Sequence, residues 1–490
     1  MKLKLVARVL SLVCLVVSLF MIFPLIWSLV DDGPDKWGFV QALFFGLAAS
    51  GVMFFAGGGR KKRDDYEELG IREAFAVVSL SWIIATAVGA LPYMLSGVLP
   101  SYTDAFFETM SGFTTTGSSV IMDVEAVPRG LLFWRAMTHW IGGMGIVVLS
   151  LAVLPFLGVG GMELYKAEVP GPTPEKLTPR VQQTALFLWA VYMLLTFLQT
   201  VLLMMGGMTL FDALAHAFST ISTGGFSTKN TSVAWFDSAY IEWVITFFMV
   251  ASGVNFSLHF LYLTGFLRRA LRDDEFRWYI GIFVGVSAVI AVFLLSWNLA
   301  DGVEHAVRAA AFQTGSFLTT TGFISENYDR WPHFTQFLLL LAAFVGGCGG
   351  STGGGLKVVR LVVLLRTIRV ACRNLLHPRA VLHTRLNGTV VSAQALGGVL
   401  SFFTLYMAII AGAALAVTLL GNDRLDVRTA LSGVVASIVN LGPGLGDLGA
   451  VDNYAWLPAG VKWIFCFCML AGRLELYAVI LLLFPSTWKR

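Results

Sequence analysis

Short clusters of glycine and threonine are the groups in this sequence best suited to bind an ion. Residues 114–118 read Thr-Thr-Thr-Gly-Ser, and residues 319–323 read Thr-Thr-Thr-Gly-Phe. Glycine tolerates positive φ angles, so such a loop can aim successive backbone carbonyls at one axis. Carbonyl oxygens from four loops around an axis can replace the water shell of a monovalent cation. These clusters therefore predict cation coordination by the backbone.

Two looser copies of the cluster complete a set of four. Residues 221–226 read Ile-Ser-Thr-Gly-Gly-Phe and residues 439–443 read Val-Asn-Leu-Gly-Pro, so each copy lies roughly one hundred residues after the last. A single cluster would be interpreted as an ordinary turn or helix contact, but four at this spacing predict four quarters of one ring. The predicted ion-contacting residues are Thr115, Thr116, Gly117, Ser222, Thr223, Gly224, Thr320, Thr321, Gly322, Asn440, Leu441 and Gly442.

The composition is typical of an integral membrane protein. Of 490 residues, 57% are hydrophobic and 13% are charged, and the mean hydropathy is +0.75, whereas about 25% of residues are charged in soluble domains. The net charge of +4 is too small to indicate a nucleic-acid partner. The five cysteines are odd in number and lie mostly in or beside apolar runs, so they indicate neither a disulfide framework nor a zinc site.

The order of apolar runs predicts an all-α polytopic membrane protein with four pseudo-repeated helix–pore loop–helix units around a central pore. Residues 5–30 and 37–57 form a two-helix extension before the first unit; the first run is longer than the apolar part of a signal peptide and no cleavage site follows it. The expected divisions are 1–70 for the extension and 71–165, 166–275, 276–387 and 388–490 for the four repeats.

Each repeat is expected to contain an outward span, a short helix, the Thr/Gly loop and a returning span. The expected spans are 74–95, 131–157, 181–205, 241–267, 278–297, 334–368, 390–420 and 457–484, and the short helices are 103–112, 209–220, 303–317 and 426–439. Carboxylates lie near the start of each short helix, at Asp104, Asp212, Asp301 with Glu304, and Asp426. The negative ends of the four helix dipoles would therefore point at the loops, which favours a cation.

Basic residues predict the orientation in the membrane. Seven Lys/Arg and no acid occur in residues 356–388, and further basic clusters fall at other turns expected on the same side. The positive-inside rule makes that side cytoplasmic, so both termini face the cytoplasm and the Thr/Gly loops lie towards the outside. The other basic residues are Arg60, Lys61, Lys62, Arg63, Lys166, Lys176, Arg180, Arg268, Arg269, Arg272, Arg277, Lys489 and Arg490.

A glycine-rich segment and one arginine are the remaining unusual features. Seven of the ten residues 346–355 are glycine, and each costs a helix about 1 kcal/mol relative to alanine, so the span must break there. The sequence after Gly355 does not match a Walker motif, which argues against nucleotide binding. Arg473 lies deep in the last span, where it needs an internal partner. Carbonyls of the broken segment are the favoured partner and Glu475 is the alternative.

Together these motifs resemble the Trk/Ktr/HKT superfamily of potassium transporters, and the two-helix extension is most similar to its bacterial TrkH/TrkG branch. The resemblance covers essentially the whole chain. It implies that Gly117, Gly224, Gly322 and Gly442 are selectivity-filter glycines and that K⁺ is the transported ion, with no cofactor in this chain. The fourth loop departs from the Thr-rich pattern at Asn440 and Leu441.

The resemblance also implies a gate, an assembly and a location. The gate would comprise Gly346, Gly347, Cys348, Gly349, Gly350, Ser351, Thr352, Gly353, Gly354, Gly355 and Arg473. The protein would be a homodimer in the bacterial inner membrane, with one pore per subunit. A cytoplasmic TrkA-like ring carrying nucleotide-binding domains would dock on it, in part through Arg366, Arg369, Arg373, Arg379 and Arg385.

Other classes of function fit less well. No Ser/His/Asp arrangement, carboxylate pair or spaced histidines indicate an enzyme, and His216 is interpreted as a packing residue. A secondary transporter that couples Na⁺ or H⁺ to solute or K⁺ movement is the main alternative, but it predicts inverted repeats, whereas these four units all begin on the same side. A structural or receptor protein would leave the four loops unexplained.

Overall fold

The computed structural model describes residues 1–59, 70–145, 181–263, 265, 271–421 and 425–488. Within these residues six helices are long and apolar enough to cross a membrane, or seven if one sharply bent pair counts as a span. The strands found there are β1 (Arg385–Leu386) and β2 (Thr389–Val390), which form a small antiparallel hairpin with Arg385 opposite Val390. The predicted all-helical, multi-pass membrane fold is confirmed.

The N-terminal extension forms a helical pair beside the first repeat. It consists of α1 (Leu3–Phe20), α2 (Ile22–Val30) and α3 (Lys36–Ala56). Helix α1 packs against α3 and against α4 (Ile71–Gly89). Gly46 of α3 faces Ser18 of α1 so closely that an added Cβ would overlap the serine hydroxyl. A small residue is therefore required for the two helices to approach. The basic residues predicted at 60–63 lie outside the described residues.

The ranges predicted to be the first two repeats contain the following elements. The first contains α4, α5 (Leu91–Leu95), α6 (Tyr102–Phe113) and α7 (Arg129–Gly143). The second contains α10 (Val181–Met205), α11 (Leu210–Ile221), the 3₁₀ turn η3 (Ser232–Phe236), α12 (Ala239–Ser252) and α13 (Phe256–Leu263). Helix α7 ends at Gly143, before the predicted end of its span at residue 157. Residues 146–157 and the basic residues Lys166, Lys176, Arg180, Arg268 and Arg269 lie outside the described residues.

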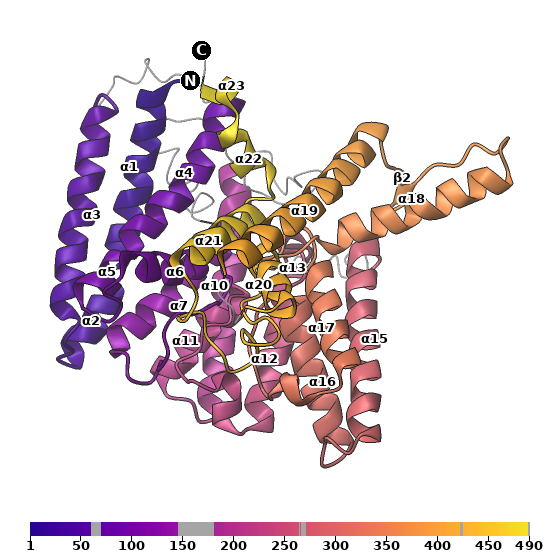
Figure 1. Ribbon diagram of the computed structural model, residues 1–490, viewed down its shortest axis with the longest axis horizontal. Helices are drawn as coiled ribbons and strands as arrows, with labels where there is room; N and C mark the ends of the chain where they lie inside the picture. The colour runs from indigo at the N-terminus through magenta and orange to yellow at the C-terminus, as the bar shows by residue number, and fades with distance from the viewer. Residues whose placement is uncertain (60–69, 146–180, 264, 266–270, 422–424, 489–490) are drawn as a thin grey trace.

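The third and fourth repeats complete the chain. The third contains α15 (Asp274–Ser296), α16 (Val303–Leu318), η4 (Tyr328–Arg330), α17 (His333–Val345) and α18 (Val358–Leu376). The fourth contains α19 (Ala393–Leu420), α20 (Val427–Val439), α21 (Ala459–Arg473), α22 (Tyr477–Leu483) and α23 (Pro485–Trp488). Figure 1 shows α18 extending outward beyond the bundle before the chain returns through the hairpin into α19, while the N-terminus and α23 lie at the same end.

Two returning spans that were expected to be continuous are broken. The predicted span 241–267 bends by 101° between α12 and α13, and the predicted span 457–484 is interrupted after Arg473, where Glu475 and Leu476 have φ angles of 53° and 61°. The break expected in the glycine-rich segment is present between α17 and α18. Among the described residues, the returning helices at 239–263, 333–376 and 459–483 are thus interrupted, and the interruption at 346–355 contains the long glycine run.

The short helices α6, α11, α16 and α20 each end directly before a Thr/Gly loop. The expected carboxylates lie at their starts: Asp426 caps α20 by accepting from the N–H of Thr429 at 2.7 Å, while Asp104 and Asp212 lie in the first turns of α6 and α11. Acidic groups are favourable at this positive end of a helix. Asp104 also pairs with Lys462 of α21 at 2.6 Å, which fastens the first short helix to the last repeat.

Candidate functional site

The four Thr/Gly loops leave their helices with one shared backbone pattern. The first loop residue has a left-handed φ, at 54° for Thr115, 56° for Thr223, 57° for Thr320 and 59° for Asn440. The N–H of the next residue then bonds the carbonyl five residues earlier in every case. These bonds join Thr116 to Ser111, Gly224 to Ser219, Thr321 to Ser316 and Leu441 to Ala436, at 2.8–2.9 Å.

This pattern corrects the register predicted for the second loop. Sequence matching paired Ser222, Thr223 and Gly224 with Thr115, Thr116 and Gly117. The backbone instead places Thr223, Gly224 and Gly225 at those three positions. Gly225 has a positive φ of 80°, and Gly117, Gly322 and Gly442 also have positive φ angles, of 86°, 81° and 96°, whereas Gly224 does not. In the other three loops the same three backbone positions are held by Thr115, Thr116 and Gly117, by Thr320, Thr321 and Gly322, and by Asn440, Leu441 and Gly442.

The third-position glycines close the four loops into a ring. A Cβ added to any of these glycines would overlap the carbonyl oxygen of the second-position residue in the next loop. The order is cyclic: Gly117 abuts Gly224, Gly225 abuts Thr321, Gly322 abuts Leu441, and Gly442 abuts Thr116. Four loops from distant parts of the chain therefore meet around one axis with their backbones in contact.

The corrected register of the second loop makes a test possible at two adjacent glycines. A Cβ at Gly224 would overlap the ring of His139, whereas a Cβ at Gly225 would overlap a backbone oxygen. We therefore expect His139→Ala to relieve part of the defect of Gly224→Ala but none of that of Gly225→Ala. Rb⁺ flux and thermal stability of the single and double variants would be compared with His139→Ala alone. Equal rescue at both glycines would contradict this register.

The segments that follow the four Thr/Gly loops, at residues 119–124, 230–234, 324–329 and 450–454, are also hydrogen-bonded to one another in a closed cycle. Adjacent segments are linked by Val124 N–H to Asn230 Oδ1 at 2.8 Å, Ala234 N–H to Ile324 O at 3.1 Å, Ala450 N–H to Asp329 Oδ2 at 2.9 Å and Tyr454 N–H to Ser119 O at 2.8 Å. Burial raises the pKa of the Asp329 carboxyl, and the hydrogen bond from Ala450 opposes that rise. These segments and the four ring glycines line an outer cavity of about 140 Å³.

The buried ion pair between Glu108 and Arg135 is hydrogen-bonded to the segments that follow the first and second loops. Arg135 Nε donates to Glu108 Oε1 at 2.7 Å, and both side chains are buried. Glu108 also accepts from the N–H of Val120 at 2.8 Å, while Arg135 donates to the Ser227 carbonyl at 2.9 Å. Because a buried charge needs such partners, the pair fixes the outer ends of two loops relative to each other. Sequence analysis did not single out these residues.

The glycine-rich loop, residues 346–355, lies against the C-terminal ends of the short helices α11, α16 and α20. Thr352 Oγ1 donates to the Ile221 carbonyl at 3.0 Å, and the N–H of Gly354 donates to Thr320 Oγ1 at 2.7 Å. A Cβ at Gly354 would overlap the carbonyl oxygen of Val439, at the end of α20. The loop thus contacts the second, third and fourth repeats directly beneath the ring.

Other bonds hold the first half of the same loop. The N–H of Cys348 donates to the Gly253 carbonyl at 2.8 Å, and the N–H of Phe256 donates to the Gly350 carbonyl at 3.0 Å. Residues 348–350 therefore pack into the break between α12 and α13. Ser351 turns back to the Cys348 carbonyl. The ten residues predicted to form the gate, Gly346, Gly347, Cys348, Gly349, Gly350, Ser351, Thr352, Gly353, Gly354 and Gly355, lie between α17 and α18.

Arg473 joins the glycine-rich loop to the first repeat. Its guanidinium donates to the Thr352 carbonyl at 2.7 Å and to the carbonyls of Gly142 and Gly143 at 2.5 and 2.9 Å. The predicted pairing of Arg473 with carbonyls of the broken segment is present. Glu475, the alternative partner, pairs with Arg360 instead. Through Arg473 the loop is also connected to the end of α7, so all four repeats contribute to its surroundings.

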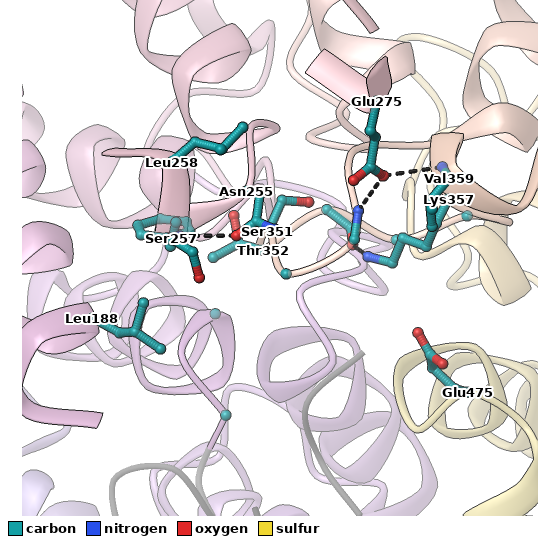
Figure 2. A pocket seen from close by; sticks show the side chains of 18 of the residues that line it. Leu188, Asn255, Ser257, Leu258, Glu275, Ser351, Thr352, Lys357, Val359 and Glu475 are labelled. Carbon is teal, nitrogen blue, oxygen red and sulfur yellow. Dashed lines mark hydrogen bonds between the residues drawn. The ribbon is translucent and has the colours of Figure 1, made fainter. Parts of the chain in front are cut away.

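A cavity of about 320 Å³ opens beneath the ring, lined by the glycine-rich loop. Figure 2 shows Glu275 and Lys357 on one side of this cavity, with Glu475 projecting from below. Lys357 reaches back to the Gly353 carbonyl. The cavity also reaches Asn440, whose amide donates to Thr116 Oγ1 and to the Met469 carbonyl. Asn440 therefore ties the fourth loop to the first and to α21.

The TrkH family, described as cation transport proteins, matches residues 36–489. The chain belongs to the TrkH family. It is 40% identical to the Trk system potassium uptake protein TrkH of Salmonella typhimurium over the full length of both chains, and 35% identical to the protein TrkG of Escherichia coli over 92% of each. The crystal structure of the potassium transporter TrkH from Vibrio parahaemolyticus matches with a TM-score of 0.87 at 35% identity, covering both chains completely.

Membership of the TrkH family identifies a multi-pass membrane transport protein rather than an enzyme. His216, which the sequence predicted to be a packing residue, is buried and contacts the Asp212 carbonyl and Ser227 Oγ at 2.8 and 2.9 Å. His139 stacks on Phe226 next to the second loop of the ring. In this TrkH-family chain the ring and the glycine-rich loop are therefore the candidate sites for ion transport.

Proposed function

We propose that this protein mediates K⁺ uptake across the bacterial inner membrane, through a selectivity filter built from the four Thr/Gly loops. The observation that carries the proposal is the cyclic contact of each third-position glycine with the second-position carbonyl of the next loop. Close backbone packing around one axis is the arrangement in which carbonyls can replace the hydration shell of a dehydrated cation. Its relatives are named potassium uptake proteins.

The filter residues in this proposal follow the structural register. They are Thr115, Thr116, Gly117, Thr223, Gly224, Gly225, Thr320, Thr321, Gly322, Asn440, Leu441 and Gly442, with Ser222 immediately before the second set. The four short helices end beside these residues, so their partial negative charges favour a cation within the ring. The division of the chain into an extension and four pore repeats is part of the same proposal.

The glycine-rich loop is proposed to be the gate. It lies directly beneath the ring, and Arg473 holds it while placing a positive charge beside the cation path. A loop with seven glycines among ten residues can change conformation at small enthalpic cost. In the closed arrangement the loop would therefore block the path below the filter, and displacement of the loop would open it.

Flux through the purified protein in liposomes tests this function. An outward K⁺ gradient should drive Rb⁺ accumulation, with Na⁺ entering much more slowly. Uptake that required a Na⁺ or H⁺ gradient would instead favour the coupled secondary transporter. Failure to conduct K⁺ or Rb⁺ under every gradient would refute the proposed function.

The assembly is proposed to be a homodimer with a cytoplasmic TrkA-like regulatory subunit. Of the five arginines expected to dock this subunit, Arg369, Arg373, Arg379 and Arg385 are exposed on α18 and the segment that follows it. Arg366 is engaged within the chain, because it pairs with Asp274 at 2.7 Å and donates to the Arg385 carbonyl. The docking surface therefore comprises the four exposed arginines.

Charge reversal at Arg369 and Arg373 separates docking from a purely topological role. We expect the double Glu variant to lose co-purification of the regulatory subunit and nucleotide-dependent flux, while membrane insertion and basal Rb⁺ flux persist. The alternative is that these residues only set topology and contact anionic lipids, each contributing about 1 kcal/mol. Retained co-purification together with retained regulation would leave only that alternative.

A further inference from the structure

Glu275, in the first turn of α15, binds both the glycine-rich loop, at Gly349, and the first turn of α18, at Val359. Its Oε1 accepts the N–H of Gly349 at 2.6 Å and that of Val359 at 3.0 Å, and the side chain is buried. Figure 2 shows both bonds converging on this one carboxylate. The segment from 349 to 359 is thus closed on itself through a side chain from another helix.

The start of α18 needs such a partner. The first N–H groups of a helix have no acceptor within the helix and favour a negative charge. Lys357, at the N-cap position of α18, supplies no side-chain hydrogen bond to them. Glu275 of α15 therefore caps the first turn of α18 and also holds Gly349. A movement of α15 relative to α18 must stretch or break one of these two hydrogen bonds.

The two residues before Glu275 bind the hairpin on the far side of α18. Asn387, in the hairpin turn, donates from its backbone N–H to Asp274 Oδ2 and from its side chain to Asp273 Oδ2, both at 2.8 Å. The N–H of Asp274 donates in return to Asn387 Oδ1 at 2.8 Å. Asp274 also pairs with Arg366 of α18 at 2.7 Å.

We propose that residues 273–275 form a mechanical link between the β1–β2 hairpin and the glycine-rich loop, with Glu275 as the positioning residue for the loop. Displacement of the hairpin would move Asn387 and, with it, Asp273 and Asp274. Glu275, the next residue, would then pull on Gly349 of the loop. The link rests on the proposed function, because it presumes that the loop limits ion flux. A different role, stability of α15 against α18 alone, predicts no change confined to the loop.

Cys348 provides a native reporter of loop position. It lies in the loop next to Gly349 and is fully buried, as is Cys468 in α21. Alkylation by N-ethylmaleimide, resolved by peptide mass spectrometry, measures the exposure of each cysteine separately. Labelling of Cys348 without labelling of Cys468 therefore reports loop displacement in a protein whose remaining core is intact.

Glu275→Ala should increase the alkylation rate of Cys348 and the basal Rb⁺ flux about tenfold, since two buried N–H groups lose their acceptor. Glu275→Gln is the matched control, because an amide oxygen at the same position can accept both hydrogen bonds; its labelling should rise less than about threefold. Unchanged Cys348 labelling in the alanine variant would overturn the proposal, as would parallel labelling of Cys468.

The hairpin end of the link is tested by Asn387→Ala. This variant should raise Cys348 labelling by a smaller factor than Glu275→Ala, whereas His383→Ala, an exposed change just before the hairpin, should have no effect. Wild-type labelling in Asn387→Ala would disprove transmission from the hairpin. Labelling of Cys348 needs no ion gradient, so its result does not depend on K⁺ flux. A failure of the proposed transport function can therefore be distinguished from a failure of the proposed link.

Discussion

Serine in place of Gly117 or Gly322 is expected to reduce the K⁺/Na⁺ permeability ratio about tenfold or more. Both glycines have left-handed φ angles, 86° and 81°, and an added Cβ would overlap the carbonyl oxygens of Gly224 and Leu441 respectively. The ring must widen to accept the side chain. Widening moves carbonyls away from a K⁺-sized cavity, and about 1.4 kcal/mol of lost discrimination corresponds to a factor of ten.

Gly97→Ser is a matched control for backbone strain. Gly97 has a φ of 79°, close to that of the ring glycines, but has no atom within 4 Å of an added Cβ. It should therefore lose some stability through the left-handed conformation without any change in selectivity. Rb⁺ and Na⁺ uptake by the three reconstituted variants would be measured together. Wild-type permeability ratios in the Gly117 and Gly322 variants would remove these loops from the filter.

Removing the Arg473 side chain is expected to raise basal Rb⁺ flux at least about tenfold. Arg473→Ala leaves the carbonyls of Thr352, Gly142 and Gly143 without the donor that now joins them, so the loop is less firmly held. The substitution also removes a positive charge beside the cation path; two like charges 4 Å apart repel by about 4 kcal/mol at an effective dielectric constant of about 20. Both effects act in the same direction.

Arg473→Lys separates the two effects. Lysine keeps the charge but cannot reproduce the forked guanidinium that reaches carbonyls in two different repeats. A flux between those of the wild type and the alanine variant is expected if both tethering and charge contribute. Deletion of Gly353 and Gly354, which removes the bond to Thr320, should also raise basal flux. A folded Arg473→Ala protein with wild-type or lower flux would make the arginine purely structural.

Local sequence patterns predicted most of this architecture because membranes impose strict rules on helix length and charge. The four loops, their helices and the break at residues 346–355 could be found from glycine, threonine and apolar runs alone. The error in the second loop arose where two glycines are adjacent: Gly224 matched the motif by letter, but only backbone φ angles and the Ser219 hydrogen bond identify Gly225 as the equivalent residue.

Features that depend on long-range contacts could not be predicted in the same way. The break after Ser252 contains only one glycine, and its contacts are with Cys348 and Gly350 of a loop about one hundred residues later in the chain. The partner of Arg473 was predicted correctly as a carbonyl of the broken segment, yet its bonds to Gly142 and Gly143 cross 331 and 330 residues. Glu275 resembles any acidic residue at a helix start until Gly349 is placed beside it.

The contact between the first and fourth loops has a consequence for biosynthesis. Asn440 reaches Thr116 across 324 residues, so the first loop is made and inserted long before its neighbour exists. The ring of four loops is therefore completed only when the last quarter of the chain has been synthesised.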